Sequence, residues 1–244
     1  MQTKEFDFFD AARNRPVPVI VYFPNNSPNN TPTVIYNHGY TDPEQFTKID
    51  EGTQKLPHKN HTYLAKFFTK KGYAFICTQH DLRSDVDGLG TIDPKSATVV
   101  TRKHLWERGV LNLLFVIEEL KKQNLDLNLD RFIIGGHSNG GDIAKYFANH
   151  NPHLISHLII CDGRRCPISP CVNLRILMFE ANDTSTDIGV IPDQGTEENL
   201  KRMNLEWVVV KPLNALHVGY SDDGPKELHD KVTKTIDWFL ENFF

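Results

Sequence analysis

Short runs of apolar residues recur along the chain, and helical patterns fall between most of them. Uninterrupted apolar runs of this length are typical of strands that are buried on both faces of a parallel sheet. Two more strands are expected at residues 5–10 and 18–23, and because no helical pattern separates them, they should form an antiparallel edge. The strands expected from the apolar runs lie at residues 34–36, 74–77, 132–134, 158–161, 176–179 and 207–210.

Helical periodicity is clearest near residues 106–120 and 228–243, where apolar side chains recur every three or four positions. Each segment would place one apolar stripe on the sheet and leave its charged residues in water. Strands that alternate with helices predict an α/β fold, in which helices cover both faces of a mainly parallel sheet. We expect one domain over residues 1–244, because this length suits a single α/β domain and no linker or internal repeat interrupts the pattern.

Reactive side chains of such sheets gather where the strands end at their carboxyl edge. The sequence Gly136-His137-Ser138-Asn139-Gly140 lies where a buried strand is expected to turn into a helix. A GxSxG sequence in that context lifts the serine hydroxyl above the edge of the sheet, so Ser138 is the candidate nucleophile. Gly136 and Gly140 would be glycine because a side chain there would collide with the neighbouring strand or helix.

An acid and a histidine follow the serine, each after a later predicted strand. His217 would take the proton of Ser138 as general base, and Asp183 would orient the imidazole ring and stabilise its charge. Asp187 lies a few residues further along the same loop and is the alternative orienting carboxylate. The chain order of the three groups is therefore serine, acid, histidine.

Acyl transfer also needs hydrogen-bond donors for the oxyanion. The glycine-containing turn after the strand at 34–36 supplies the backbone N–H of Tyr40, and the residue after the serine supplies that of Asn139. His38 and His137 adjoin these two turns and are candidate substrate contacts.

Arg165 belongs to an Asp-Gly-Arg-Arg sequence at the end of another predicted strand, also at the active edge. A guanidinium group there could hold a substrate carboxylate through bidentate hydrogen bonds. The alternative is an internal ion pair that braces the loop, because arginines in enzymes pair internally more often than with substrate.

Composition limits the partners and the compartment. The formal net charge is −4, so no basic surface is indicated for nucleic acid. No apolar run approaches the roughly 20 residues of a membrane helix, and the first residues lack the apolar core of a signal peptide. We therefore expect a cytoplasmic protein, unless a leader has been removed. The four cysteines do not indicate a structural zinc site, and Cys166 and Cys171 would form a disulfide only in an oxidising compartment.

The chain resembles the α/β-hydrolase superfamily, in its serine esterase and dienelactone-hydrolase-like branch. The resemblance rests on the turn at His38-Gly39, the elbow at 136–140, the acid segment at 180–183 and the histidine segment at 216–219. It implies a Ser-His-Asp triad that hydrolyses esters or thioesters through an acyl-enzyme, with no metal or organic cofactor. Dienelactone hydrolases themselves use a cysteine nucleophile, so their particular substrate does not carry over to a chain with a serine at this position.

The expected function is hydrolysis of small or moderately sized carboxylic esters. A thioesterase or an acyltransferase would use the same residues, and a non-catalytic binding protein on this fold is a further alternative. The segments 41–60 and 82–97 lack a clear periodicity and should form the walls of an open cleft. No partner beyond a small-molecule ester is indicated, and we expect a monomer or a small homo-oligomer.

Overall fold

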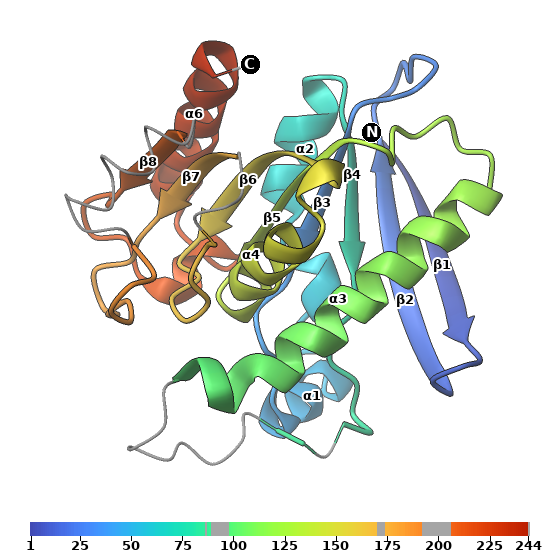
Figure 1. The fold of residues 1–244 in the computed structure, drawn as a ribbon, viewed down its shortest axis with the longest axis horizontal. Coiled ribbons are helices and arrows are strands. Elements are labelled where there is room, and N and C mark those ends of the chain that lie inside the picture. The colour runs from blue at the N-terminus through green and yellow to red at the C-terminus, as the bar shows by residue number, and fades with distance from the viewer. Residues whose placement is uncertain (86, 89–97, 170–173, 192–205, 244) are drawn as a thin grey trace.

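A mixed eight-stranded sheet forms the centre of the computed structural model, which describes residues 1–85, 87–88, 98–169, 174–191 and 206–243 (Figure 1). The strands lie side by side in the order β1-β2-β4-β3-β5-β6-β7-β8. Every strand that the apolar runs predicted is present. In chain order the strands are β1 (Gln2–Asp10), β2 (Arg15–Phe23), β3 (Thr33–Asn37), β4 (Ala74–Thr78), β5 (Phe132–His137), β6 (Ile155–Cys161), β7 (Arg175–Phe179) and β8 (Glu206–Val210).

Helices connect most of the parallel strands and pack on the sheet. None of the helices in the described ranges is long and apolar enough to cross a lipid bilayer. The helices are α1 (Pro43–Asp50), α2 (Thr62–Lys70), α3 (Thr98–Lys122), α4 (Asn139–His150) and α6 (Lys226–Asn242), and short 3-10 turns form η1 (Pro57–Lys59), η2 (Pro152–Leu154) and η3 (His217–Tyr220).

The first two strands form the antiparallel edge of the sheet. β1 pairs antiparallel with β2, and β2 pairs antiparallel with β4. From β4 to β8 all neighbouring strands are parallel. The predicted architecture, a mainly parallel sheet with an antiparallel N-terminal edge and helices on both faces, is therefore confirmed. Because the parallel strands all end at one edge, the loops that follow β3, β5, β6, β7 and β8 meet there.

Two apolar cores cover the two faces of the sheet, because successive side chains of a strand point to opposite sides. Ile35 of β3 packs in the core beneath α3 and α4, whereas its neighbours Val34 and Tyr36 pack in the core beneath α2 and α6 (Figure 1). A strand covered on both faces needs buried residues at every position, and all five residues of β3 and of β4 are buried. This is why these strands appear in the sequence as continuous apolar runs.

Helix α1 was not predicted, because the segment 41–60 lacks a clear helical periodicity. A capping box holds the start of this helix: the Asp42 carboxylate accepts the N–H of Gln45 at 2.8 Å, and the Gln45 side chain accepts the N–H of Asp42 at 2.9 Å. These two hydrogen bonds satisfy N–H groups that would otherwise lack acceptors at a helix start. The capping pair is the sequence signal for this short helix.

The turn from β5 into α4 packs tightly against the neighbouring backbone. A Cβ atom added at Gly140 would overlap the backbone of Asn37 and His38, and one added at Gly136 would overlap the backbone of Gly140. The predicted steric reason for these two glycines is therefore confirmed. The close packing also determines where the residue between them, Ser138, stands above the sheet.

Gly140→Ala should lower the free energy of unfolding by at least about 3 kcal/mol, because backbone atoms cannot move aside for the new methyl group. Gly72→Ala is the control: its φ is +88° and the methyl group would meet nothing within 4 Å. The control should lose only about 1 kcal/mol, the cost of a left-handed alanine. Urea unfolding followed by circular dichroism measures both losses, and equal losses would contradict the packing argument.

Candidate active site

Ser138 stands at the sharp turn between β5 and α4. Its backbone has φ 55° and ψ −126°, a conformation that costs free energy for a residue with a side chain. Hydrogen bonds on both sides hold the turn: the N–H of Ser138 donates to the carbonyl of Cys161 on β6 at 2.9 Å, and the N–H groups of Gly141 and Asp142 donate to the carbonyl of Ser138. Such a turn presents the serine hydroxyl at the carboxyl edge of the sheet.

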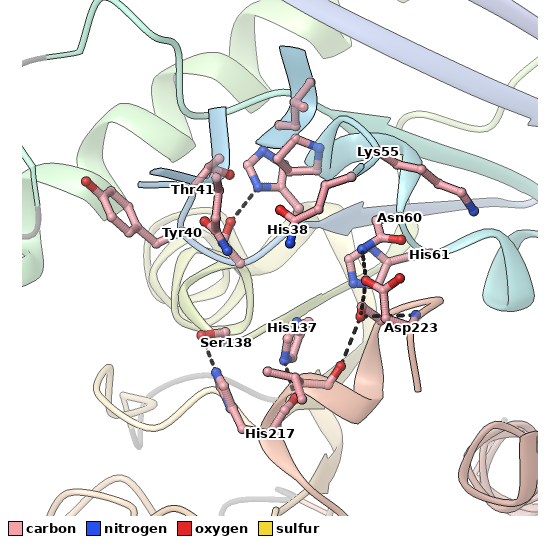
Figure 2. A pocket seen from close by; sticks show the side chains of 17 residues that line it. His38, Tyr40, Thr41, Lys55, Asn60, His61, His137, Ser138, His217 and Asp223 are labelled. Carbon is pink, nitrogen blue, oxygen red and sulfur yellow. Dashed lines mark hydrogen bonds between the residues drawn. The ribbon is translucent and has the colours of Figure 1, made fainter. Parts of the chain in front are cut away.

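His217 lies at the start of η3, in the connection that follows β8. Its Nε2 is 3.0 Å from Oγ of Ser138, and Figure 2 shows the ring and the hydroxyl directed toward each other. The structure therefore brings the predicted serine and the predicted histidine within hydrogen-bond distance.

The carboxylate at the His217 ring belongs to Asp162, which corrects the expectation that Asp183 orients the ring. Nδ1 of His217 is 2.5 Å from Oδ2 of Asp162, the first residue after β6. Asp183 is exposed and accepts a hydrogen bond from the backbone N–H of His217 at 2.8 Å, so it contacts the main chain and not the ring. Asp187, the alternative acid, forms an ion pair with Arg165.

The topology explains why sequence reasoning chose the wrong acid. β6 and β7 are neighbours and end at the same edge, so an acid after either strand can face a histidine that follows β8. Asp162 follows its strand directly, whereas three residues separate Asp183 from Phe179 at the end of β7. Direct attachment keeps the Asp162 carboxylate at the rim of the sheet, while Asp183 is carried outward on the loop. The sequence signal that favours Asp162 is its position as the first residue after a buried strand.

Asp162 is 1% exposed and is held by several donors. Its Oδ1 accepts the N–H of Ala181 at 2.9 Å, and its Oδ2 accepts the hydroxyl of Thr184 at 2.9 Å in addition to the histidine ring. Burial alone would raise the pKa of Asp162, but these three hydrogen bonds outweigh burial and hold its pKa below the ordinary value. The carboxylate is therefore ionised at neutral pH. It places the ring proton on Nδ1 and leaves Nε2 of His217 to accept the proton of Ser138.

His137, a predicted substrate contact, holds the backbone of the histidine loop. It is 8% exposed, and its Nε2 donates to the carbonyl oxygen of His217 at 2.8 Å, with the two rings 4.8 Å apart. Burial is the main cause that lowers the pKa of His137 to about 3, and the neighbouring His217 lowers it further. The His137 ring is therefore neutral at neutral pH and fixes the position of its neighbour.

His38, another predicted substrate contact, has both ring nitrogens bonded within the protein. Its Nδ1 is 2.6 Å from the carbonyl oxygen of Gly39, and its Nε2 accepts the backbone N–H of His80 at 2.8 Å. Burial is the main cause that lowers the pKa of His38 to about 4. The ring borders the cavity described below, but its hydrogen bonds stabilise the turn that carries Tyr40 and are not available to substrate.

The two predicted oxyanion donors lie beside the serine. Asn139 is the first residue of α4, where backbone N–H groups have no acceptor within the helix. The indole N–H of Trp106 donates to Oδ1 of Asn139 at 3.1 Å and so holds the Asn139 side chain in place. Tyr40 directly follows Gly39, and Gly39 lies close to the serine: a Cβ atom added at Gly39 would be 3.2 Å from Cβ of Ser138. The start of a helix also favours negative charge through its dipole. The geometry therefore suits an oxyanion beside the serine.

A cavity of about 380 Å³ opens beside Ser138 and His217. Thr41 and residues of α1 and of the segment that follows it line the cavity, so the segment 41–60 forms a wall, as predicted. Figure 2 shows Lys55 and His61 across the cavity from His217. Most of the other predicted wall, the segment 82–97, lies outside the described residues.

The segment that carries His217 is fastened to α2 by Asp222. The N–H of Tyr63 donates to Oδ1 of Asp222 at 3.1 Å, and the hydroxyl of Thr62 donates to Oδ2 at 2.9 Å. The N-cap residue of α2, His61, makes no side-chain cap of its own, so Asp222 caps this helix from a distant part of the chain. Sequence reasoning missed Asp222 because N-cap signals are sought next to the helix they cap.

Arg165 forms an internal ion pair with Asp187, which was the alternative to substrate binding.

Cys166 is a buried free thiol, and Cys171, its candidate disulfide partner, lies outside the described residues. Within the described ranges, no group of three or more His, Cys, Asp or Glu side chains is placed to hold a metal ion.

Solved structures match this architecture over nearly the whole chain. A dienelactone hydrolase-like promiscuous phosphotriesterase from metagenomic libraries has a TM-score of 0.65 at 13% identity, covering 100% of this chain and 99% of that one. An S-formylglutathione hydrolase from Agrobacterium tumefaciens has a TM-score of 0.60 at 13% identity, covering 99% and 95%. The chain has the α/β-hydrolase fold. A Pyrobaculum calidifontis esterase shares this fold with a TM-score of 0.61 at 12% identity, covering 98% of this chain and 84% of that one. No family model matches the sequence, and no curated protein matches it.

On this α/β-hydrolase fold, Asp162→Asn should slow covalent labelling by a fluorophosphonate at least about 100-fold, because an amide favours the wrong tautomer of the His217 ring. Asp183→Asn, the matched variant, should slow labelling by at most about tenfold, since it weakens only an exposed hydrogen bond to the main chain. The rate of fluorescent labelling followed on gels measures both effects. A greater loss in Asp183→Asn would return the orienting role to that residue.

Proposed function

We propose that the chain is a serine hydrolase that cleaves carboxylic esters of small or moderate size through an acyl-enzyme. The observation that carries this proposal is the hydrogen-bonded line from Asp162 through His217 to Ser138, with distances of 2.5 and 3.0 Å. A serine hydroxyl is a weak nucleophile by itself, and contact with a base that a carboxylate orients is what activates it. The fold, which matches esterases and dienelactone hydrolases at low identity, supports the same reaction class.

In the acylation step, Nε2 of His217 takes the proton of Ser138 while Oγ forms a bond to the ester carbonyl carbon. The carbonyl electron pair moves to oxygen, where the backbone N–H groups of Tyr40 and Asn139 stabilise the charge. Nε2 then gives its proton to the oxygen of the leaving alcohol as the C–O bond breaks. Asp162 stays ionised throughout and stabilises the imidazolium.

In the deacylation step, water takes the place of the alcohol. His217 accepts a proton from this water as its oxygen bonds to the acyl carbon, and the proton passes to Oγ of Ser138 as the acyl bond breaks. The products are a carboxylic acid and the free enzyme. Each step uses groups of the chain itself, so the proposal includes no metal ion or organic cofactor.

The proposed substrate size rests on the lining of the cavity of about 380 Å³ beside Ser138 and His217. The side chains of Thr41, Lys55 and Asn60 border it together with the histidines of the site. A long hydrocarbon chain would leave these polar groups without water or hydrogen-bond partners, which is unfavourable. A short group that leaves these side chains hydrated suits this cavity better than a long hydrocarbon chain.

Ser138→Ala should lower kcat/KM for para-nitrophenyl acetate by at least about 1,000-fold, because the alcohol that forms the acyl-enzyme is removed. Ser27→Ala, at an exposed position in the loop after β2, is the control and should keep the wild-type rate. A screen of para-nitrophenyl esters and acyl-CoA thioesters of increasing chain length measures the effect. Turnover of thioesters alone would indicate a thioesterase. A wild type that is inert on all substrates and unlabelled by fluorophosphonate would indicate a binding protein.

A further inference from the structure

A second, smaller cavity also adjoins the serine. Its volume is about 230 Å³, and Ser138 and Asn139 lie on its wall. Three arginines, Arg102, Arg164 and Arg165, line the same cavity. Such a concentration of positive charge next to a nucleophile is a feature that the hydrolysis of a neutral ester does not require.

Two carboxylates border this cavity as well, and both are engaged by other groups. Asp142 lies 3.1 Å from Nζ of the fully buried Lys145 and accepts the backbone N–H groups of Arg165 and Cys166. Asp162 is engaged by the histidine ring and the two other donors described above. These anions therefore brace the loop after β6 and the catalytic histidine.

Two of the three arginines pair within the protein, and the third does not. Arg165 forms its ion pair with Asp187, and Nε of Arg164 is 3.4 Å from Oδ2 of Asp162. Arg102, near the start of α3, forms no hydrogen bond or ion pair with any residue in the described ranges, and its Nε is buried. Burial lowers the pKa of Arg102, the nearby cations Arg165 and Arg164 lower it further, and the Asp142 carboxylate acts in the opposite direction. Asp142 nevertheless contacts Lys145 and backbone N–H groups, and it makes no ion pair with Arg102. The guanidinium of Arg102 therefore lacks a hydrogen-bonding anion on the described part of the chain.

The position of His217 indicates which part of an ester would enter each cavity. The leaving alcohol must lie near Nε2 of His217, because that nitrogen supplies its proton. His217 lines the larger cavity and is not among the residues that line the smaller one. The alcohol therefore belongs in the larger cavity, and the acyl group, which is bonded to Ser138 in the intermediate, extends into the smaller one.

We propose that the acyl part of the substrate carries a carboxylate, which Arg102 binds in the smaller cavity with Arg164 beside it. This inference rests on the proposed function, since it names the substrate class of the same site. A planar carboxylate matches the two parallel N–H groups of a guanidinium. A doubly charged phosphate is less suitable, because the carboxylates of Asp142 and Asp162 border the same cavity and would repel it more strongly. The predicted substrate is therefore a monoester of a small dicarboxylic acid.

The test compares two substrates that differ only at the end of the acyl chain: the mono-para-nitrophenyl ester of adipic acid and the para-nitrophenyl ester of hexanoic acid. Arg102→Gln should lower the ratio of kcat/KM for the charged ester to that for the neutral ester by about tenfold or more, because one charged hydrogen-bond partner is lost. Lys103→Gln is the matched control, since it removes one positive charge from an exposed position of the same helix, outside the cavity. It should change the ratio by less than about twofold, because salt screens such distant charges.

The outcomes separate this inference from the proposed function. Equal changes in Arg102→Gln and Lys103→Gln would show only general attraction between charges, and would overturn the inference. An unchanged ratio in Arg102→Gln, with neutral ester hydrolysis that still depends on Ser138, would also overturn it and leave the proposed function intact. A wild type that hydrolyses neither ester would contradict the proposed function and the inference together.

Discussion

The contact between the Asp162 carboxylate and the His217 ring is the interaction on which the site depends. A buried carboxylate is unfavourable unless hydrogen bonds replace its lost water. Asp162 finds them in the N–H of Ala181, the hydroxyl of Thr184 and the histidine ring. These donors come from the connections that follow β7 and β8, so one acid after β6 ties three neighbouring loops together. The same charge that orients the base therefore also stabilises the edge of the sheet where the base stands.

The backbone around His217 is held as firmly as its ring. His137 donates to its carbonyl oxygen, Asp183 accepts its N–H, and Asp222 fastens the following residues to α2. Ser138 is held from the other side of the site, because Gly140 packs tightly against the turn that follows β3. Neither Ser138 nor His217 therefore has to move far for a proton to pass from Oγ to Nε2. Such preorganisation is a large part of how hydrolases lower the barrier to acyl transfer.

Much of this architecture could be predicted from the sequence, because strands buried on both faces leave continuous apolar runs and the GxSxG turn has its own signature. Ser138 and His217 could be placed for the same reason, as each follows a recognisable strand. The prediction of the acid was wrong: Asp162 directly follows a buried strand, which favours it, but the sequence does not show how far the loop after β7 carries Asp183 from the sheet. The roles of Asp222 and of Arg102 could not be predicted either. Asp222 caps a helix that is distant in the chain, and Arg102 lines a cavity beside a serine that is also distant, so only the folded arrangement brings these residues together.

The most direct test of the account is the proton NMR signal of the hydrogen bond between His217 and Asp162. The proton on Nδ1, shared at 2.5 Å with a buried carboxylate, should give a strongly deshielded resonance in the wild-type protein. This resonance should disappear in Asp162→Asn and persist in Asp183→Asn. A resonance that persists in Asp162→Asn and disappears in Asp183→Asn would show that the acid after β7 orients the ring, and would rule out the role assigned to Asp162.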